Sequence, residues 1–511
     1  MYICYSISYS VTQEEWEKVY EETLELAKKL NLADWSKFYY KGIRHYAYCK
    51  VKEETEVEFD EENHYWLTCA EYNHLADGEY FRLDRELNNM KYNKDAGPAI
   101  LRIIDSYTNV SSEDYKNQTY YNVTDHCKGF YFIRLLAILC LMESRLKEKV
   151  FIYGDVNKRD CETAVELANK HLKEPIELPA RCDYKRLYEI VKTIDIPEEE
   201  KLYLMENEYL GEIDLEYKAF IENNFNQNII SQFWKKRFEN CRIEDHKFKE
   251  ILKTYLSYGF DLKKLFSYIS IPKTEEENLT LLEMIIEAAH SNSYFNKLEL
   301  SRNPKDDRVR YLPPEFIKSL FGSESQITIQ NYTFENLVNE LSKCFKDQVD
   351  VRTFLKEKIK DIDEDTMILQ LQDLHKKDNY YLFEGEEKFD IIWAFELMDY
   401  KTGDSISPYL LDELMETAKT NRELLESKEY KELEKKESTE QIYELIDLRP
   451  HFAARDIDWH HAIDYFNTHT DALKRYYPLF KMKLEFLTPG ENIATALFMN
   501  DDLYEFYEKL T

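Results

Sequence analysis

Glycine is scarce in this chain, and its spacing restricts the folds that the chain can adopt. The 511 residues include only eleven glycines, and the closest two, Gly385 and Gly403, are eighteen positions apart. Phosphate loops of nucleotide hydrolases, dinucleotide-binding turns, the kinase glycine-rich loop and the nucleophile elbow of α/β-hydrolases need paired glycines, because their backbones bend sharply or approach a ligand closely. The sequence excludes the standard forms of these sites. The HExxH zinc motif and the EF-hand calcium loop are also absent.

The chain is strongly acidic. Asp and Glu total 99 against 68 Lys and Arg, which gives a formal net charge of −31. A surface of this charge repels nucleic-acid phosphates and anionic lipid headgroups, so we do not expect binding to bulk nucleic acid or to a membrane. The acidic residues are spread along the whole chain, which favours a role in solubility. The alternative interpretation is a nucleic-acid mimic or a cap for a basic partner.

Cysteine usage indicates a reducing compartment. The nine cysteines are scattered along the chain, and no CxxC pair occurs. This pattern is typical of a cytosolic protein with buried thiols rather than of a disulfide framework or a structural zinc site. The first lysine is Lys18, so we expect no secretion signal. The longest apolar run, 130–142, contains Arg134 and is too short for a bilayer. We therefore expect a cytoplasmic protein with a buried helix at this run.

The first hundred residues carry strand and helix patterns. Residues 2–9 alternate between two faces, which predicts a half-buried strand. Thr12 and Glu15 have the spacing of a helix capping box, and apolar residues follow them at helical intervals. Further strands are predicted at 45–51 and 65–70, separated by an acidic, turn-like stretch.

A helix, a strand and a second helix are predicted next. The first helix is expected around 130–148, the strand at 149–153 and a tight turn at Gly154 and Asp155. A helical pattern follows the turn. This order is that of an α/β unit, so we predict a mixed α/β domain over residues 1–205.

Beyond residue 205 the pattern is helical almost throughout. The fold class that we predict is an α+β multidomain protein, with an N-terminal mixed α/β domain followed by mainly α-helical domains that could be repeat-like. The predicted later domains cover 206–300, 315–440 and 441–511. Linker candidates are the proline-containing loop 301–314 and the charged run 421–440, which is expected to be an exposed helix, and a strand is predicted at 481–487.

Residues 247–289 contain one segment with a family resemblance. Leu252 and Leu256 lie in a helical pattern, Gly259 and Asp261 form a Gly-x-Asp turn, and a Thr-x-Leu sequence begins at Thr280. This order resembles one divergent ankyrin repeat. It departs from the family pattern where Leu281 replaces the proline and Glu283 replaces the histidine. The resemblance implies a helical-repeat binding surface, because one repeat alone cannot bury its own faces.

The turn after the predicted strand at 149–153 carries the first candidate catalytic residues. Asp155 follows the strand, and Cys161 falls in the first turn of the next helix. A carboxylate at such a position can hold a metal or act as an acid, and the helix dipole favours a thiolate at Cys161. The structural alternative is that Gly154 makes the turn, Asp155 or Asn157 caps the helix and Cys161 packs in the core.

A cluster of histidine and aspartate near the C-terminus gives the candidate metal ligands. If 459–467 is helical, His460 and Asp464 share a face, and His461 lies three positions from Asp464. Imidazole and carboxylate ligands suit Zn²⁺, Mn²⁺ or Fe²⁺ and could activate a water molecule. Adjacent side chains point about 100° apart on a helix, so we do not expect His460 and His461 to share one metal. The alternative is a structural role in capping or in a polar surface.

His126 is the remaining candidate. Asp125, His126 and Cys127 contain the residue types of a cysteine-nucleophile triad. Neighbouring residues cannot form a relay with one another, so His126 would need a partner from elsewhere, such as Cys161 or Cys182.

Taken together, these patterns favour recognition over catalysis. We predict an acidic, cytoplasmic protein-protein interaction module that binds another protein, with a basic partner favoured, and that acts as an inhibitor, an immunity-type protein or a scaffold. The 40 tyrosines suit such contacts, although an AT-biased genome would also encode them. We expect no cofactor. The alternative is a metal-dependent hydrolase or nuclease that uses a divalent metal at the C-terminal His/Asp cluster.

Overall fold

The structure is a computed structural model of the chain. It divides into two compact units, the first formed by Met1–Pro179 with Leu382–Thr511 and the second by Ala180–Tyr381. The chain is an α+β protein with an N-terminal antiparallel sheet region and a mainly helical remainder, which confirms the predicted fold class. The four-domain division stays a prediction. The residues that the structure describes are 3–8, 10–40, 43–58, 61–75, 77–89, 130–211, 213, 215–239, 241–243, 245–257, 262–269, 274–291, 334–346, 348–354, 397–448, 454–482 and 489–510.

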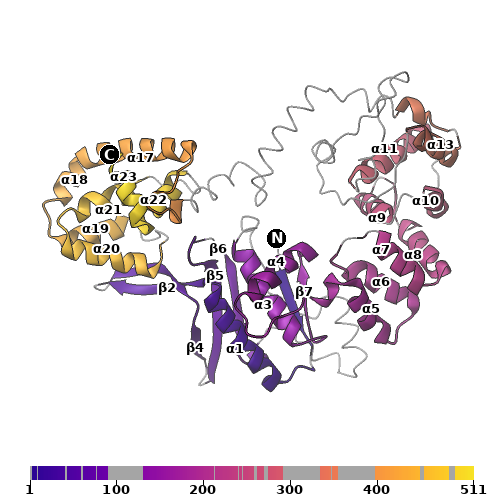
Figure 1. The fold of residues 1–511 in the computed structure, drawn as a ribbon, viewed down its shortest axis with the longest axis horizontal. Helices are drawn as coiled ribbons and strands as arrows, with labels where there is room; N and C mark the ends of the chain where they lie inside the picture. The colour runs from indigo at the N-terminus through magenta and orange to yellow at the C-terminus, as the bar shows by residue number, and fades with distance from the viewer. Residues whose placement is uncertain are drawn as a thin grey trace. The chain divides into compact units, whose positions relative to one another are not determined.

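Two strands that are distant in sequence form a small sheet in the first unit (Figure 1). β1 (Ile3–Ile7) pairs antiparallel with β7 (Val150–Gly154). All side chains of β1 are buried, including Cys4 and Ser6 on the face that was expected to be exposed. The prediction of a half-buried strand is therefore wrong, because the small sheet is covered on both faces.

Three helices pack in the same region as this sheet. α1 (Gln13–Lys29) begins at the predicted capping box, where the Glu15 N–H donates to Thr12 Oγ1 at 3.3 Å and the Thr12 N–H donates to Glu15 Oε2 at 2.9 Å. α3 (Phe130–Arg145) is the predicted buried apolar helix, and it packs against α1, β7 and α4 (Lys158–Asn169).

A five-stranded antiparallel sheet completes the N-terminal region. Its strands are β2 (Leu32–Tyr40), β3 (Ile43–Lys50), β4 (Glu53–Glu58), β5 (Glu61–Glu71) and β6 (Asp77–Asp84). The path runs β3-β2-β5-β4, and β6 also pairs with β5. β3 and β5 confirm the two predicted strands. The acidic stretch predicted as a turn between them is strand β4, because it pairs with β5 along its whole length from Glu53 opposite Trp66 to Glu58 opposite Glu61.

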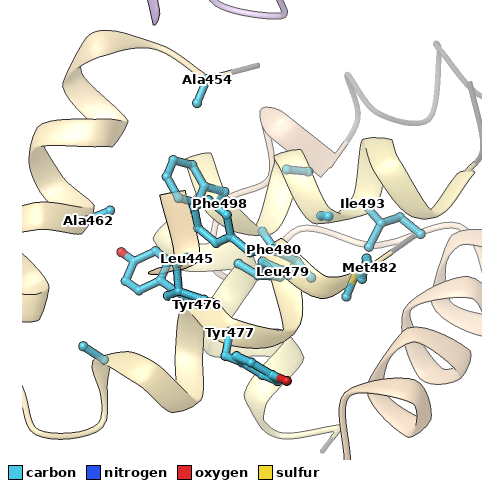
Figure 2. Close-up of a cluster of buried hydrophobic side chains, with 14 of the residues drawn as sticks. Leu445, Ala454, Ala462, Tyr476, Tyr477, Leu479, Phe480, Met482, Ile493 and Phe498 are labelled. Atoms are coloured by element: carbon cyan, nitrogen blue, oxygen red, sulfur yellow. The ribbon is translucent and has the colours of Figure 1, made fainter. Parts of the chain in front are cut away.

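The C-terminal part of the first unit is helical and has its own apolar core. Its helices are α17 (Pro408–Glu426), α18 (Lys428–Leu433), α19 (Ser438–Leu448), α20 (Asp456–Thr468), α21 (Ala472–Lys481), α22 (Pro489–Met499) and α23 (Asp501–Glu508). Figure 2 shows Tyr476, Leu479 and Phe480 of α21 among Leu445 of α19 and Phe498 of α22. These side chains bury a large apolar area, which holds the helices together.

The second unit consists of helices among its described residues. They are η2 (Ala180–Cys182), α5 (Tyr184–Thr193), α6 (Glu198–Glu208), α7 (Leu215–Asn224), α8 (Gln227–Glu239), α9 (His246–Ser257), α10 (Leu262–Tyr268), α11 (Glu275–Ser291) and α13 (Phe334–Phe345).

The ankyrin resemblance places a helix start near Thr280. In the structure α11 begins five residues earlier, directly after Thr274, and α10 precedes it. The predicted repeat character stays a prediction.

Several other expectations concern loops and surfaces. The charged run 421–440 is divided among α17, α18 and α19, and it buries Tyr430 and Leu433 rather than lying wholly exposed. The predicted linker 301–314 and most of the predicted strand 481–487 lie outside the described residues. Within the described part of the chain, every helix is too short or too polar to cross a bilayer.

Candidate functional site

The structure explains the turn after β7 by helix capping. Gly154 adopts φ 119°, a conformation that glycine reaches without strain, and Asp155 beyond it is exposed. Asn157 caps α4, since the Asp160 N–H donates to Asn157 Oδ1 at 2.9 Å. Cys161 is fully buried. Asp155 and Cys161 therefore do not form a shared open site, and a catalytic role for either stays a prediction.

The histidines and aspartate of α20 contact different neighbours. His460 Nδ1 lies 2.6 Å from the Asp456 carbonyl oxygen, and His461 Nε2 lies 3.7 Å from Asp501 Oδ2 on α23. Asp464 is exposed. Among the described residues, no group of three or more His, Cys, Asp or Glu side chains is arranged to hold a metal ion. A metal site at His460, His461 and Asp464 stays a prediction.

The triad hypothesis falls largely outside the structure. Asp125, His126 and Cys127 lie outside the described residues. The proposed partner Cys182 is buried in the second unit.

A group of charged side chains gathers on one face of the five-stranded sheet. We call Asp34, Glu54, Glu56, Arg82 and Asp84, together with Tyr65, the acidic sheet face. Glu54 lies directly opposite Tyr65, and Tyr65 lies opposite Asp84, so one row crosses β4, β5 and β6. Side chains alternate along a strand, so Glu56 and Arg82, two positions away, share this face.

Arg82 is the central cation of the acidic sheet face. Its Nη1 lies 3.0 Å from Glu56 Oε2, its Nε donates to Asp84 Oδ1 at 2.8 Å, and its guanidinium lies 3.7 Å from the centre of the Tyr65 ring. Burial acts to lower the pKa of Arg82, but the hydrogen bonds to Asp84 and Glu56 raise it overall. Arg82 therefore stays charged and orders two carboxylates around itself.

Two further carboxylates enlarge the negative charge. Burial raises the pKa of Asp34 to about 7, and the nearby Glu54 adds to this shift. Glu54 itself lies 3.1 Å from the exposed Lys52. The acidic sheet face has four carboxyl groups against one arginine. A cation that approached Asp34 would favour its ionised form, so the charge of this face can increase on binding.

β4 forms an outer edge of the sheet. Among the described residues its only strand partner is β5. In an antiparallel pair every second residue turns its N–H and C=O away from the partner, so these outward groups of β4 have no strand partner within the part of the chain that the structure describes. Val57 is 67% exposed beside this edge. A six-residue strand with four glutamates is thus available to a further strand.

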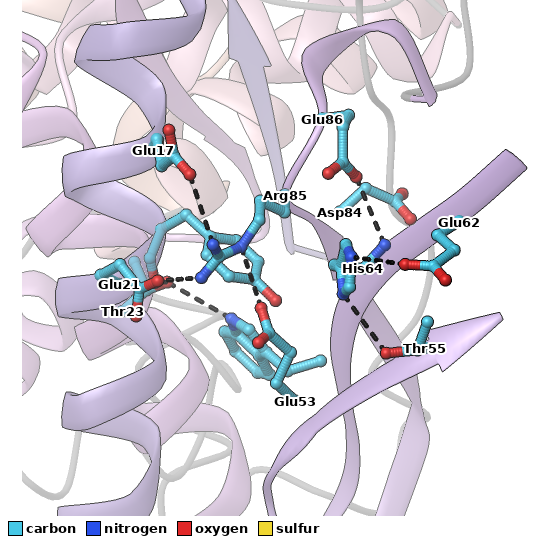
Figure 3. Close-up of polar contacts among 12 residues, drawn as sticks. Glu17, Glu21, Thr23, Glu53, Thr55, Glu62, His64, Asp84, Arg85 and Glu86 are labelled. Atoms are coloured by element: carbon cyan, nitrogen blue, oxygen red, sulfur yellow. Dashed lines mark hydrogen bonds and ion pairs between the residues drawn. The ribbon is translucent and has the colours of Figure 1, made fainter.

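Contacts on the opposite face hold β4 in place. Figure 3 shows Arg85 between Glu53 of β4 and Glu17 and Glu21 of α1. The Arg85 Nε donates to Glu53 Oε1 at 2.9 Å, and Nη1 donates to Glu17 Oε1 at 3.3 Å. Next to them, Thr55 Oγ1 lies 3.3 Å from His64 Nδ1. The edge is therefore fixed before any partner binds.

A second charged cluster joins the sheet to the C-terminal helices of the same unit. His74 Nδ1 lies 3.1 Å from Glu71 Oε2, and His74 Nε2 lies 2.7 Å from Asp399 Oδ2. Burial acts to lower the pKa of His74, but the two carboxylates raise it overall. Each ring nitrogen of His74 lies beside a carboxylate, so this side chain links Glu71 to Asp399 and is not placed as a general base or a metal ligand. We call Glu71, His74 and Asp399 the His74 clasp.

Backbone and tyrosine contacts reinforce this clasp. The Tyr48 N–H donates to the Ala454 carbonyl oxygen at 3.0 Å, and the Tyr72 hydroxyl donates to Asp456 Oδ1 at 2.6 Å. Arg455 pairs with Asp458 at 2.7 Å. Burial raises the pKa of Asp458 in spite of this arginine. These contacts join residues that lie far apart in the chain, and none of them involves β4.

Comparison with models of protein families, with curated proteins and with solved structures finds no match to this chain. A function for this chain is therefore inferred from the geometry of its own residues.

Proposed function

We propose that this chain is a protein-binding module that takes a basic, extended segment of a partner along the outer edge of β4. The observation that carries the proposal is the edge itself. Glu54 and Glu56 precede an exposed Val57 on β4, and no further strand pairs with β4 among the described residues. Strand addition at such an edge supplies backbone hydrogen bonds, and alternate side chains supply specificity.

Charge supports a basic partner. Lysine or arginine side chains of an added strand would face Glu54 and Glu56, while a small apolar side chain would face Val57. Each exposed ion pair contributes only about 0.2–1 kcal/mol, so several pairs and the backbone ladder must act together. The net charge of −31 would speed the encounter with a cationic partner and weaken that advantage at high salt.

This activity fits an inhibitor, an immunity-type protein or a scaffold that works in the cytoplasm. Most of the described cysteines are buried, which is the usage expected of a protein in a reducing compartment. The alternative, a metal-dependent hydrolase using the His/Asp cluster of α20, stays a hypothesis that no contact among the described residues favours.

A matched pair of variants tests the proposal. The probe is a fluorescent twelve-residue peptide that alternates lysine and valine, and the assay is fluorescence anisotropy in low salt. Glu54→Gln with Glu56→Gln removes two pairs, so the affinity should fall about 2–30-fold, which corresponds to ~0.4–2 kcal/mol. Glu162→Gln with Glu166→Gln removes the same charge from the exposed face of α4 and should leave the affinity almost unchanged.

A proline substitution separates strand addition from simple charge attraction. Val57→Pro removes one N–H from β4 and should weaken the peptide at every salt concentration without a change in net charge. Circular dichroism checks that the variant is folded. Equal loss of affinity in the α4 variant, or full affinity in folded Val57→Pro, would contradict binding at this edge.

A further inference from the structure

The first three glutamates of β4 are each paired with a cation of the chain itself. The pairs are Glu53–Arg85 at 2.9 Å, Glu54–Lys52 at 3.1 Å and Glu56–Arg82 at 3.0 Å. A basic partner that binds along β4 therefore meets carboxylates that already have a cation beside them. It must share each carboxylate with that cation or displace the cation.

The two arginines are held by several contacts each. Arg82 also donates to Asp84 at 2.8 Å and covers the Tyr65 ring at 3.7 Å, and 32% of its side chain is exposed. Arg85 also pairs with Glu17 of α1 at 3.3 Å, and 22% of its side chain is exposed. A partner cation would have to break these further contacts to displace either arginine.

Lys52 differs from the arginines, because its side chain makes a single ion pair among the described residues. The backbone just before it is fixed, since Val51 is buried and its N–H donates to the Leu32 carbonyl oxygen at 3.1 Å. The Lys52 side chain, however, is 65% exposed, and that of Glu54 is 36% exposed. Exposed ion pairs are weak, because water screens them and both side chains lose conformational freedom. Lys52 is therefore the cation that a partner can displace.

Lys52 also acts on the acidic sheet face. Burial raises the pKa of Asp34, Glu54 adds to that rise, and Lys52 acts against it. Lys52 thus lies close enough to both carboxyl groups to offset part of their charge. Once Lys52 is displaced, Glu54 and Asp34 both attract the cation that replaces it.

We propose that Lys52 is an internal competitor of the basic partner: it occupies Glu54 in the free chain, and a lysine of the added strand takes its place there on binding. This inference rests on the proposed function, because it concerns one position of the same edge. In an added antiparallel strand, the residue opposite Glu54 points to the same face with its Cβ about 4.5–5.5 Å away, so a lysine there reaches the carboxylate. Arg82 remains beside Glu56. Glu54 is thus the residue that determines where the partner needs a lysine.

Removal of the Lys52 charge should strengthen binding of the lysine-valine peptide. Lys52→Gln leaves Glu54 unoccupied, so the affinity should rise about 1.4–5-fold in the anisotropy assay in low salt, which corresponds to ~0.2–1 kcal/mol. Lys170→Gln is the matched control, because Lys170 is 62% exposed and pairs with Glu166 of α4 at 3.0 Å. It changes the net charge equally and should leave the affinity almost unchanged. Lys52→Arg keeps the competing charge and should bind the peptide like the wild type.

A double-mutant cycle places the competition at Glu54. The gain from Lys52→Gln should largely disappear in a Glu54→Gln background, because no carboxylate remains there for Lys52 to occupy. The gain should persist in a Glu56→Gln background. Two results would overturn the inference. One is a gain from Lys52→Gln no larger than that from Lys170→Gln, and the other is an undiminished gain in the Glu54→Gln background.

These results are distinguishable from a failure of the proposed function. Peptide binding that depends on Glu54, Glu56 and Val57 but not on Lys52 would retain the β4 edge and reject the competitor. Full peptide affinity in folded Val57→Pro would contradict binding at the edge itself. Absence of peptide binding to both the wild type and Lys52→Gln would contradict the proposed function and this inference together.

Discussion

The loss of stability expected when the contacts of His74 are removed depends on how deeply each of its two carboxylate partners is buried. Glu71 is 0% exposed, whereas Asp399, on the other side of the imidazole, is 69% exposed. His74→Ala leaves the Glu71 carboxylate buried, with Arg134 at 3.5 Å as the cation that remains beside it among the described residues. Breaking a buried pair in this way should lower the free energy of unfolding by about 3–5 kcal/mol. Asp399→Ala breaks only the exposed half, so it should cost about 0.2–1 kcal/mol.

The sign of the pH dependence follows from the two pKa shifts. The pKa of His74 is raised in the folded chain. The contribution of His74 to the free energy of unfolding is therefore complete below the unfolded pKa of 6.5, and it is lost as the pH rises through the folded pKa. Burial acts to raise the pKa of Glu71, but His74 and Arg134 lower it overall. The contribution of Glu71 to the free energy of unfolding is therefore complete above the unfolded pKa of 4.5, and it is lost as the pH falls through the folded pKa. The effect of His74→Ala should therefore be larger at pH 6 than at pH 9.

Urea denaturation of the full chain measures these differences, with near-ultraviolet circular dichroism reporting on the packed state. The dependence on urea should keep its slope, because the variants change stability and not the surface exposed on unfolding. Two results would contradict this account of the contacts of His74. One is an equal loss of unfolding free energy in Asp399→Ala and His74→Ala, and the other is a larger loss in His74→Ala at pH 9 than at pH 6.

Three further predictions concern the sheet, the core and a helix end. In carbon-13 NMR the Asp34 carboxyl should titrate near pH 7, and Glu54→Gln should lower that midpoint because a neighbouring negative charge is removed; an unchanged midpoint would refute the coupling. Leu445→Ala, at a fully buried position of the C-terminal core, should lower the free energy of unfolding by about 2–5 kcal/mol in urea denaturation, whereas Met415→Ala, on a 54% exposed side chain, should change it by less than about 0.5 kcal/mol. Thr12→Ala removes the acceptor that caps α1 and should cost about 0.5–2 kcal/mol in the same assay, with Thr12→Asn, which keeps a capping oxygen, as its control.

Local patterns in the sequence predict the elements whose side chains decide their own structure. β1, α1, α3 and β7 carry apolar runs, periodicity or a capping box, and the structure places elements at those positions. β4 was missed because four of its six residues are glutamate, a residue that strands disfavour. Its pairing with β5 decides its structure. The alternation of Thr55 and Val57 between glutamates is the one local signal that could have revealed it.

The candidate sites depend on contacts that no local pattern encodes. Asp399 meets His74 and Asp456 meets Tyr72 across more than three hundred residues. The sequence did identify the acidic character, because charge is a sum over the chain, whereas the basic partner stays a prediction. The place where that charge meets the outer strand of a sheet is a property of the fold.

Hydrogen exchange along β4 tests binding at the sheet edge most directly. We expect the outward N–H groups of Glu53–Glu58 to exchange with solvent in the absence of the peptide, because no further strand pairs with them among the described residues. Saturation with the lysine-valine peptide should slow exchange in this segment, with no matching change in α4. Unchanged exchange in β4 at saturation, or protection confined to another part of the chain, would contradict strand addition.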